Sequence, residues 1–198
     1  MIKIFFDTEF TGLHQNTTLI SIGLISEDGR TFYGEFNDYD RSQVDQWIQE
    51  NVVDNLTLVG KVGDLDQGGR VEFGNEANMR TGRGLHWEFR GDKKYIEREL
   101  RQWFYQFTHE CYQVELWSDV LNYDWTLFRD LFNEDLPNNI YYIPFDLATL
   151  FKIKGVDPDI NREELAGVEE GDIPKHNSLH DAIVIKKCYE VVMEDASQ

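Results

Sequence analysis

Two carboxylates follow the first apolar stretch of the chain. Asp7 and Glu9 stand two residues apart in "FFDTEFTGL", directly after "IKIFF". Side chains two residues apart on a strand point to the same face, so both carboxylates would aim at one place and repel each other. A solvated strand end is the common explanation for such a pair on its own. The pair becomes informative only together with other acidic residues of the chain.

Two further aspartates stand at predicted helix starts. Asp124 follows Asn122 in "LNYDWTLF", and Asp181 lies in the first turn of the predicted last helix, in "HNSLHDAIVI". An acid in a first helical turn also complements the helix dipole, and Ser178 with Asp181 approaches the spacing of a capping box. Each aspartate therefore has a structural explanation, and a chemical role depends on all four acids meeting.

Four carboxylates that converge at the end of a sheet cannot all stay ionised without cations between them. Mg²⁺ and Mn²⁺ prefer such hard oxygen ligands. Two of these ions about 4 Å apart can hold the attacking and leaving oxygens of an in-line phosphoryl displacement. We therefore expect one site for two divalent ions, formed by Asp7, Glu9, Asp124 and Asp181.

Hydrolysis also needs a group that takes a proton from water. His176 lies five residues before Asp181, just outside the predicted last helix. A loop there could hold the imidazole near the metals, and the pKa of imidazole suits this work. A histidine before a helix is more commonly a surface residue, so this hypothesis depends on the acids beside it.

The order of these motifs resembles the DnaQ-like, or DEDD, 3′–5′ exonucleases of the RNase H-like fold. The resemblance runs from Ile2 to about Val192, and its motifs are "DTEFTGL", "NYD" and "HNSLHD". It implies a fold with a metal-dependent exonuclease site. The implied site consists of the metal ligands Asp7, Glu9, Asp124 and Asp181 and the general base His176.

One position indicates the subclass. The tyrosine form of the third motif would carry Tyr four residues before the last aspartate, where this chain has Asn177. The resemblance therefore favours the histidine subclass (DEDDh). His180 is next to Asp181, and that spacing is wrong for the base.

The openings "DTEF" and "LISIG" are similar to those of small mycobacterial- and phage-type 3′–5′ exoribonucleases. Phe10 stands where the family more usually has Thr, which concerns contacts to the terminal nucleotide and not the metals. By family analogy, Thr11 and Leu13 would lie beside the 3′-terminal nucleotide.

The composition bounds these interpretations. The chain has 198 residues, of which 41% are hydrophobic, and no apolar run reaches the roughly 18 residues of a membrane span. No basic-then-apolar leader opens the sequence. Cys111 and Cys188 lack the spacing of a metal site. We therefore expect reduced, buried thiols in a cytoplasmic protein without membrane segments.

The formal net charge of −18 argues against a polyanionic partner, because nucleic-acid binding draws on Lys and Arg. The basic residues are unevenly spread, however: seven of 19 lie between Arg80 and Arg101. A helix predicted there would align three of them as a basic stripe, which we expect to contact phosphates: Lys94, Arg98 and Arg101. The alternative is a solvated helix face that pairs with Glu97 and Glu99.

Strands come first along the chain, and strands and helices then alternate. Strands are predicted at residues 1–6, 18–26, 31–36, 112–118 and 140–145. Helices are predicted at residues 41–56, 93–107, 123–132, 147–153 and about 178–194. Residues 61–91, rich in glycine and polar residues, are predicted as an insertion or mobile loop with room for a short hairpin. We expect a single α/β domain over 1–198: an RNase H-like three-layer fold whose mixed central sheet is flanked by helices.

The predicted function is metal-dependent 3′–5′ exonuclease activity on single-stranded nucleic acid, with RNA favoured and 5′-mononucleotides as products. One alternative keeps the fold and acts on DNA or short oligonucleotides. A second is a non-catalytic acidic mimic of nucleic acid, which the net charge fits and the ordered motifs do not. A homodimer is left open.

Overall fold

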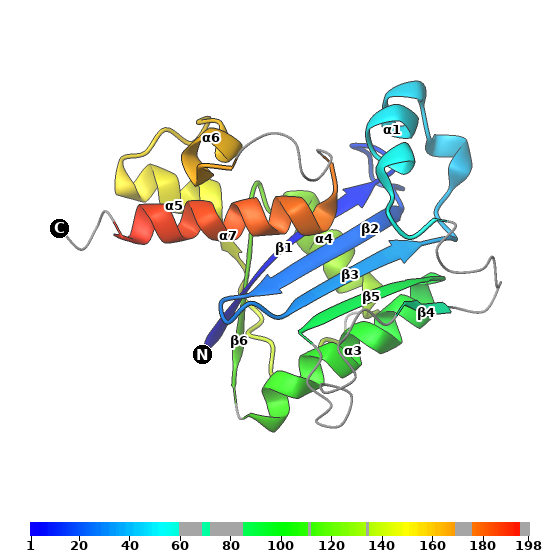
Figure 1. Cartoon of the computed structure of the whole chain (residues 1–198), viewed down its shortest axis with the longest axis horizontal. Helices are drawn as coiled ribbons and strands as arrows, with labels where there is room; N and C mark the ends of the chain where they lie inside the picture. Colours follow the sequence, from blue (N-terminus) through cyan, green and yellow to red (C-terminus); the bar gives the residue numbers. More distant parts are fainter. Residues whose placement is uncertain (60–68, 72–84, 111, 134, 169–175, 195–198) are drawn as a thin grey trace.

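The computed structural model describes residues 1–59, 69–71, 85–110, 112–133, 135–168 and 176–194. In these ranges, seven strands form one sheet in the order β4-β5-β3-β2-β1-β6-β7 (Figure 1). The strands are β1 Ile2–Phe10, β2 Leu19–Ser26, β3 Thr31–Phe36, β4 Gly69–Val71, β5 His86–Gly91, β6 Val114–Ser118 and β7 Phe145–Asp146. The pairs β1–β2, β2–β3 and β4–β5 are antiparallel, whereas β1–β6, β3–β5 and β6–β7 are parallel. The predicted mixed sheet is confirmed.

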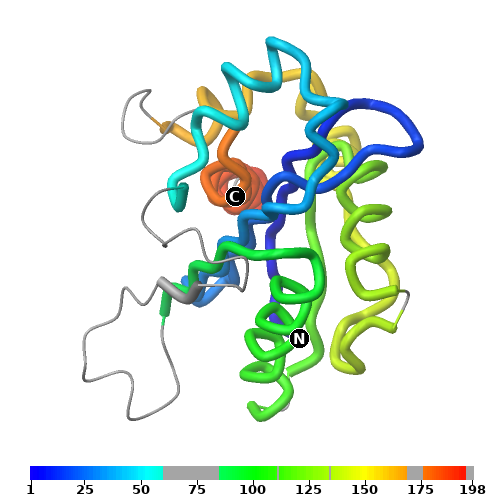
Figure 2. Tube along the Cα trace, turned by 90° about the vertical axis from the view of Figure 1, so that its right-hand side faces the viewer, coloured from blue at the N-terminus to red at the C-terminus, as the bar shows by residue number. Residues whose placement is uncertain are grey.

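Helices cover both faces of the sheet. They are α1 Gln46–Asn51, α3 Lys93–His109, α4 Asn122–Leu131, α5 Leu147–Lys154, α6 Arg162–Ala166 and α7 Ser178–Glu194. One hydrophobic cluster packs α3 and α4 against the sheet, and another packs α5, α6 and α7 against its other face. Figure 2 shows α7 and α4 on either side of β1. The predicted three-layer architecture is therefore confirmed.

The alternation of β1 decides which side chains meet which layer. Ile4 and Phe6 belong to the cluster with α3 and α4, whereas Phe5 belongs to the cluster with α7. The strand continues to Phe10, four residues beyond its predicted end. Because side chains alternate, Asp7 and Glu9 lie on the same face as Phe5, the face that α7 covers.

The amphipathic pattern of α3 is also confirmed. Asp92 caps its first turn by accepting a hydrogen bond from the Tyr95 amide. The predicted apolar face is fully buried and consists of Ile96, Leu100, Trp103, Phe104 and Phe107. These aromatic side chains supply much of the apolar contact between the helix and the sheet.

The single helix predicted over residues 41–56 is wrong. The segment forms a 3₁₀ turn at Arg41–Gln43, the short α1, and a second 3₁₀ turn at Val53–Asn55. The carboxylates of Asp40 and Asp45 each accept a hydrogen bond from a nearby backbone amide, so each starts a new turn. Trp47 of α1 is 54% exposed.

The strand predicted over residues 140–145 is largely wrong as well. Ile140 makes an isolated bridge to Val114, and regular pairing resumes only at β7. Pro144 lies between them and has no amide hydrogen to give to a ladder. Tyr142 is exposed as a consequence of this irregular path.

Part of the predicted insertion is regular structure. The strand β5 occupies the last six residues of this range and pairs in parallel with β3. On its other edge, β5 pairs antiparallel with the short strand β4. Phe89 of β5 is 1% exposed and packs into the main core, which fixes the strand to the sheet. Residues 60–68 and 72–84 lie outside the described part of the chain.

Two further expectations concern membranes and thiols. Within the described ranges, no helix combines the length and apolarity that crossing a bilayer would need. Cys188 is a free, buried thiol, as predicted, and burial raises its pKa to about 11. Cys111 lies outside the described residues.

The start of α7 sits directly on β2 at a glycine. A Cβ added at Gly23 would lie 2.2 Å from the amide nitrogen of Leu179 and 2.3 Å from the carbonyl carbon of Ser178. Beside it, the hydroxyls of Ser21 and Ser178 hydrogen-bond at 2.9 Å in a buried position. Gly23 pairs with Asp7 across the β1–β2 ladder, so this contact brings the first turn of α7 to the carboxylates of β1.

We expect Gly23→Ala to push α7 away from the sheet, because its Cβ would meet backbone atoms that cannot rotate aside. The free energy of unfolding should fall by about 1–3 kcal/mol, the usual cost of overpacking. Affinity for Mn²⁺ should fall too, since Asp181 moves with the helix. Urea unfolding and calorimetric titration measure the two effects.

Gly34→Ala is the matched control in the neighbouring strand. Its Cβ would meet a methyl carbon of Ile96 at 2.9 Å, and that side chain can adjust. We expect a smaller loss of stability and unchanged Mn²⁺ affinity. Equal effects of the two variants on Mn²⁺ affinity would contradict the role given to Gly23.

Candidate active site

Three of the four predicted metal ligands converge at the end of β1. Asp7, Glu9 and Asp181 each offer a carboxylate oxygen, and these oxygens all lie within 4.8 Å of one another. The first two come from β1 and the third from the first turn of α7. The three side chains are half-buried. This cluster joins residues 172 or more positions apart in sequence, which local patterns alone cannot do.

Asp124 reaches the same end of the sheet from the opposite layer. It lies in the first turn of α4 and is buried. Its Oδ1 accepts hydrogen bonds from the Thr8 amide (3.1 Å) and hydroxyl (2.5 Å), and its Oδ2 accepts one from the Ser118 hydroxyl (3.0 Å). These donors fix the carboxylate and offset part of the cost of burying it.

Burial and mutual repulsion dominate the electrostatics. Burial raises the pKa of Asp7 well above its ordinary value, and the charges of Asp124 and Asp181 add to this. Burial likewise raises the pKa of Glu9 to about 8, helped by the charge of Asp181 and a hydrogen bond with it. Such a bond between two carboxyl groups needs a shared proton. Without a cation, the cluster therefore retains protons that ordinary carboxyl groups have lost.

Asp124 shows the opposing influences. Burial raises its pKa to about 6, while the hydrogen bonds from Thr8 and Ser118 act in the other direction. A fifth carboxylate, Asp119 at the end of β6, adds repulsion at Asp7 and Asp124. Arg162 holds Asp119 through two hydrogen bonds of 2.8 and 3.2 Å. The chain thus neutralises this additional acid with its own arginine.

His176 stands at the entrance to α7 in an unusual backbone conformation. Its φ is +60°, which places a non-glycine residue in the left-handed region. Its ring meets the Trp47 ring edge-on, with centroids 5.0 Å apart and planes at 72°. Asn177 follows it and caps α7, because its Oδ1 accepts hydrogen bonds from the amides of Leu179 and His180.

The surroundings of His180 differ from those of the carboxylate cluster. Burial lowers the pKa of His180, and the neighbouring charges that act on it come from Glu163 and Lys187. Glu163 belongs to α6. The charges that act on the imidazole thus come from α6 and from α7 itself. The prediction that His180 has the wrong spacing for the base stays a prediction.

The two residues predicted beside the terminal nucleotide have different environments. Thr11 is buried; its hydroxyl donates to Gln43 Oε1 (2.5 Å) and accepts from the Thr18 amide (2.9 Å). It therefore holds the loop after β1 in place. Leu13 of that loop is 77% exposed. Phe10, the departure from the family pattern, stacks on Tyr123 with centroids 5.3 Å apart.

The basic stripe on α3 makes the contacts that the alternative interpretation predicted. Arg98 pairs with Glu99 at 2.7 Å, and Arg101 pairs with Glu97. Both guanidinium groups also lie over aromatic rings. Lys94 is exposed. The helix's own acids thus offset two of the three charges, and phosphate binding by the stripe stays a prediction.

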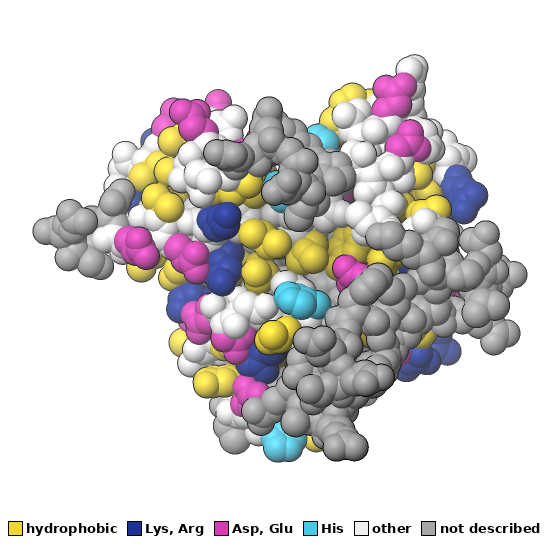
Figure 3. Space-filling view, viewed as in Figure 1, with side chains coloured by type: hydrophobic (Ala, Val, Ile, Leu, Met, Phe, Trp, Pro, Cys, Tyr) yellow, Lys and Arg dark blue, Asp and Glu magenta, His cyan; other side chains and the backbone are white. Residues whose placement is uncertain are grey.

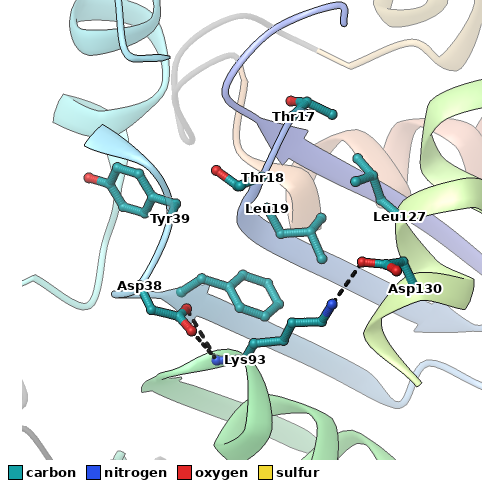
Figure 4. Close-up of a pocket in the computed structure, with 9 residues that line it drawn as sticks. Thr17, Thr18, Leu19, Asp38, Tyr39, Lys93, Leu127 and Asp130 are labelled. Atoms are coloured by element: carbon teal, nitrogen blue, oxygen red, sulfur yellow. Dashed lines mark hydrogen bonds and ion pairs between the residues drawn. The ribbon is translucent and has the colours of Figure 1, made fainter. Parts of the chain in front are cut away.

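A small cleft of about 110 Å³ is bordered by the start of α3, by α4, by the start of β2 and by the segment that follows β3 (Figure 4). Lys93 reaches across it to Asp130 with an Nζ–Oδ2 distance of 2.7 Å. The Lys93 amide donates to both oxygens of Asp38, at 3.1 and 3.0 Å. The ion pair links the start of α3 to α4, and the two hydrogen bonds link it to the segment that follows β3.

The sequence argument missed four residues around the site: Thr8, Trp47, Ser118 and Asp119. Thr8 stands inside the first motif, yet its contact with Asp124 depends on how α4 packs. Ser118 reaches Asp124 because β6 lies parallel to β1, in the register that pairs Phe5 with Trp117. Trp47 lies in the segment predicted as one helix, and its contact with His176 joins residues far apart in the sequence. No local signal distinguishes these residues from ordinary strand and helix positions.

The fold as a whole is similar to that of S. pombe Pop2p, whose structure was solved in a Mg²⁺- and Mn²⁺-bound form. The TM-score is 0.54 at 14% sequence identity, over 96% of this chain and 82% of that one. At this identity the likeness concerns the fold, which is RNase H-like. The acidic cluster lies at the end of β1, an interior strand of the sheet.

A family model assigns the chain more closely. The model of the 3′–5′ exoribonuclease Rv2179c-like domain matches residues 2–193, so the chain belongs to that family. The 3′–5′ exoribonucleases Rv2179c and MT2234.1 of Mycobacterium tuberculosis, strains H37Rv and CDC 1551, are each 34% identical to it over 55 residues. This alignment spans 28% of the chain and only 33% of either relative.

The raised pKa values predict how the stability of the metal-free protein depends on pH. The ordinary pKa of Glu9 is 4.5, and in the folded state it is about 8. Between these two pH values the folded state keeps a proton on Glu9 that the unfolded chain has released. Stability should therefore fall as pH rises through this range. Glu9→Gln should flatten the decline and raise the free energy of unfolding at the alkaline end by an amount on the order of 2 kcal/mol. Urea unfolding in EDTA measures both.

Asp28→Asn is the control with the opposite sign. Burial would raise the pKa of Asp28, but hydrogen bonds and the charge of Arg30 outweigh burial and lower it. The stability that the Asp28 carboxylate contributes is fully present above its ordinary pKa. Asp28→Asn should therefore lower the free energy of unfolding, without changing how that free energy depends on pH at higher pH. A wild-type protein equally stable at about pH 5 and about pH 8 in EDTA would contradict the electrostatics of the cluster.

Proposed function

We propose that this protein is a 3′–5′ exoribonuclease that hydrolyses single-stranded RNA from its 3′ end and releases 5′-mononucleotides. The observation that carries the proposal is the meeting of Asp7, Glu9 and Asp181 within 4.8 Å, in a chain of the Rv2179c-like family. Asp124 lies close enough for its charge to act on the first two. The order of motifs along the sequence supports the same conclusion.

The residues present fit divalent metal ions. The cluster offers only carboxylate oxygens, and burial together with their mutual repulsion raises the pKa values of Asp7 and Glu9 when no cation is bound. Mg²⁺ and Mn²⁺ take such ligands. We assign two ions to Asp7, Glu9, Asp124 and Asp181. When bound, they supply positive charge that orients the scissile phosphate and stabilises the charge that develops on it.

The chain's own groups do the remaining work. His176 accepts the proton of the attacking water, and Trp47 limits the orientations of its ring. Thr8 and Ser118 hold the Asp124 carboxylate at a fixed angle. Leu13, exposed on the loop after β1, offers an apolar surface to the terminal nucleotide, and Thr11 fixes that loop.

Burial of the acids favours an enzyme over an acidic mimic of nucleic acid. A mimic needs its carboxylates at the surface, whereas Asp124 is buried and its partners in the cluster are half-buried. Acidic side chains do gather on the surface over α6 and the end of α7, and lysines and arginines lie among them (Figure 3). We propose a cytoplasmic enzyme, because its cysteines lack metal spacing and suit a reducing compartment.

The proposal is tested with 5′-end-labelled single-stranded RNA and DNA of one sequence. With Mn²⁺ present, we expect stepwise shortening of the RNA from its 3′ end, faster than that of the DNA, and none in EDTA. A 3′-phosphate should slow the reaction strongly. Asp7→Asn should abolish turnover while the protein stays folded. Rapid cutting of a circular single strand would indicate an endonuclease, and full activity of Asp7→Asn would exclude this site.

The role of the base is tested by comparing two histidines of the same segment. His176→Ala should lower kcat by about 10²–10⁴, the usual contribution of general-base catalysis, and should leave Mn²⁺ affinity close to wild type. His180→Ala is the control and should retain most of kcat, since the charges that act on His180 come from Glu163 and Lys187. The reverse order of the two effects would show that His180 is the base.

A further inference from the structure

We propose that Tyr33 is a positioning residue for His176, acting through Asn177. This inference rests on the proposed function, in which His176 is the general base. Tyr33 lies on β3, two strands away from β1, and no motif includes it. Its side chain is 2% exposed, so any role in turnover has to pass through the residues that it contacts.

The Tyr33 hydroxyl forms a directed bridge between the sheet and the turn that precedes α7. Asn177 Nδ2 donates to this hydroxyl at 3.2 Å, and the hydroxyl donates to Glu35 Oε1 at 3.1 Å. Ser21 hydrogen-bonds to Tyr33 as well, and Ser21 contacts the first residue of α7. The hydroxyl therefore lies among groups from β2, β3 and the start of α7.

The acceptor of this bridge is itself fixed. Glu35 is fully buried, and its Oε1 also accepts a hydrogen bond from the Leu58 amide at 2.8 Å. Its Oε2 lies 3.5 Å from Nε of Arg90 on β5. The ion pair with Arg90 includes no hydrogen bond, so the Leu58 amide fixes Oε1 and gives the Tyr33 hydroxyl a defined direction. The two hydrogen bonds of the bridge consequently fix the Asn177 side chain relative to the sheet.

Asn177 is held at both ends of its amide group. Its Oδ1 caps α7 by accepting from the amides of Leu179 and His180, both at 3.2 Å, while its Nδ2 donates to Tyr33. Rotation of this side chain would break bonds on both sides. Its backbone, and the peptide that joins it to His176, are restrained accordingly.

This restraint matters because His176 needs one. A non-glycine residue with a φ of +60° is strained by about 1–2 kcal/mol and persists only where its surroundings enforce the conformation. Trp47 touches the imidazole from the side of α1 but does not fix the backbone. The Tyr33–Asn177 hydrogen bond restrains the residue that follows His176, and so contributes to the direction in which the imidazole points.

The test compares Tyr33→Phe in the wild-type and His176→Ala backgrounds. The phenylalanine ring fills the same space, so the substitution removes the hydrogen bonds of the hydroxyl, with Asn177, Glu35, Ser21 and Thr57, without changing the packing. In the wild-type background, we expect kcat with single-stranded RNA and Mn²⁺ to fall about 10- to 100-fold, as for a misplaced catalytic group, with KM little changed. In the His176→Ala background, the same substitution should cost less than about two-fold, because there is no imidazole left to position.

Asn177→Ser provides a second route to the same interaction. Serine is a good helix cap but cannot reach Tyr33, so kcat should fall to a similar extent, and combining it with Tyr33→Phe should add little. Tyr189→Phe is the matched control: it removes a phenolic hydroxyl from the far part of α7, where Tyr189 packs on Phe5 and Trp117, and kcat should not change.

The possible results separate the two ideas. An equal fold loss from Tyr33→Phe in both backgrounds would overturn the inference, because the tyrosine would then act on the carboxylates or on the fold in general. Wild-type kcat in Tyr33→Phe would overturn it as well. Undiminished turnover in His176→Ala alone would instead contradict the proposed base, whatever Tyr33→Phe does.

Discussion

The close contact between α7 and β2 at Gly23 is the constraint on which the site depends. The absence of a Cβ lets the backbone of Ser178 and Leu179 lie against the strand, directly across from Asp7. That contact places Asp181 beside the two carboxylates of β1. The same helix start carries Asn177 and His176, so one packing contact sets both the acids and the imidazole.

This arrangement concentrates like charges, and the rest of the structure compensates for it. Thr8 and Ser118 solvate Asp124 with hydrogen bonds, and Arg162 neutralises the neighbouring Asp119. Burial, together with the remaining repulsion, raises the pKa values of Asp7 and Glu9. Two aromatic-rich hydrophobic clusters, one on each face of the sheet, supply the apolar burial that holds the charged end together.

The distribution of charge qualifies the role of the basic residues. Arg98 and Arg101 are engaged by acids of their own helix, and Lys93 by Asp130. Local ion pairs of this kind are weak at a surface and can exchange for phosphate contacts, so they do not exclude a nucleic-acid track. They do mean that a polyanion would compete with carboxylates already in place, which makes binding through α3 strongly dependent on salt.

How much of this could be predicted from the sequence depended on the range of each interaction. The period of α3 and the bounds of α7 and β3 follow from local patterns, and the structure reproduces them. The helix predicted over 41–56 failed because Asp40 and Asp45 bind nearby amides, and the strand over 140–145 failed around Pro144. In these segments one or two side chains outweighed the average pattern.

The sequence by itself determined the chemical types at the site: four acids and a histidine, in the order that identifies the family. Only the tertiary structure decided that three of these acids meet within 4.8 Å, that the fourth is solvated by Thr8 and Ser118, and that Tyr33 reaches Asn177. The physical reason is that residue type and spacing act over one or two turns of chain. Strand register and helix packing, in contrast, join residues more than a hundred positions apart, and the sequence carries no local signal of those partners.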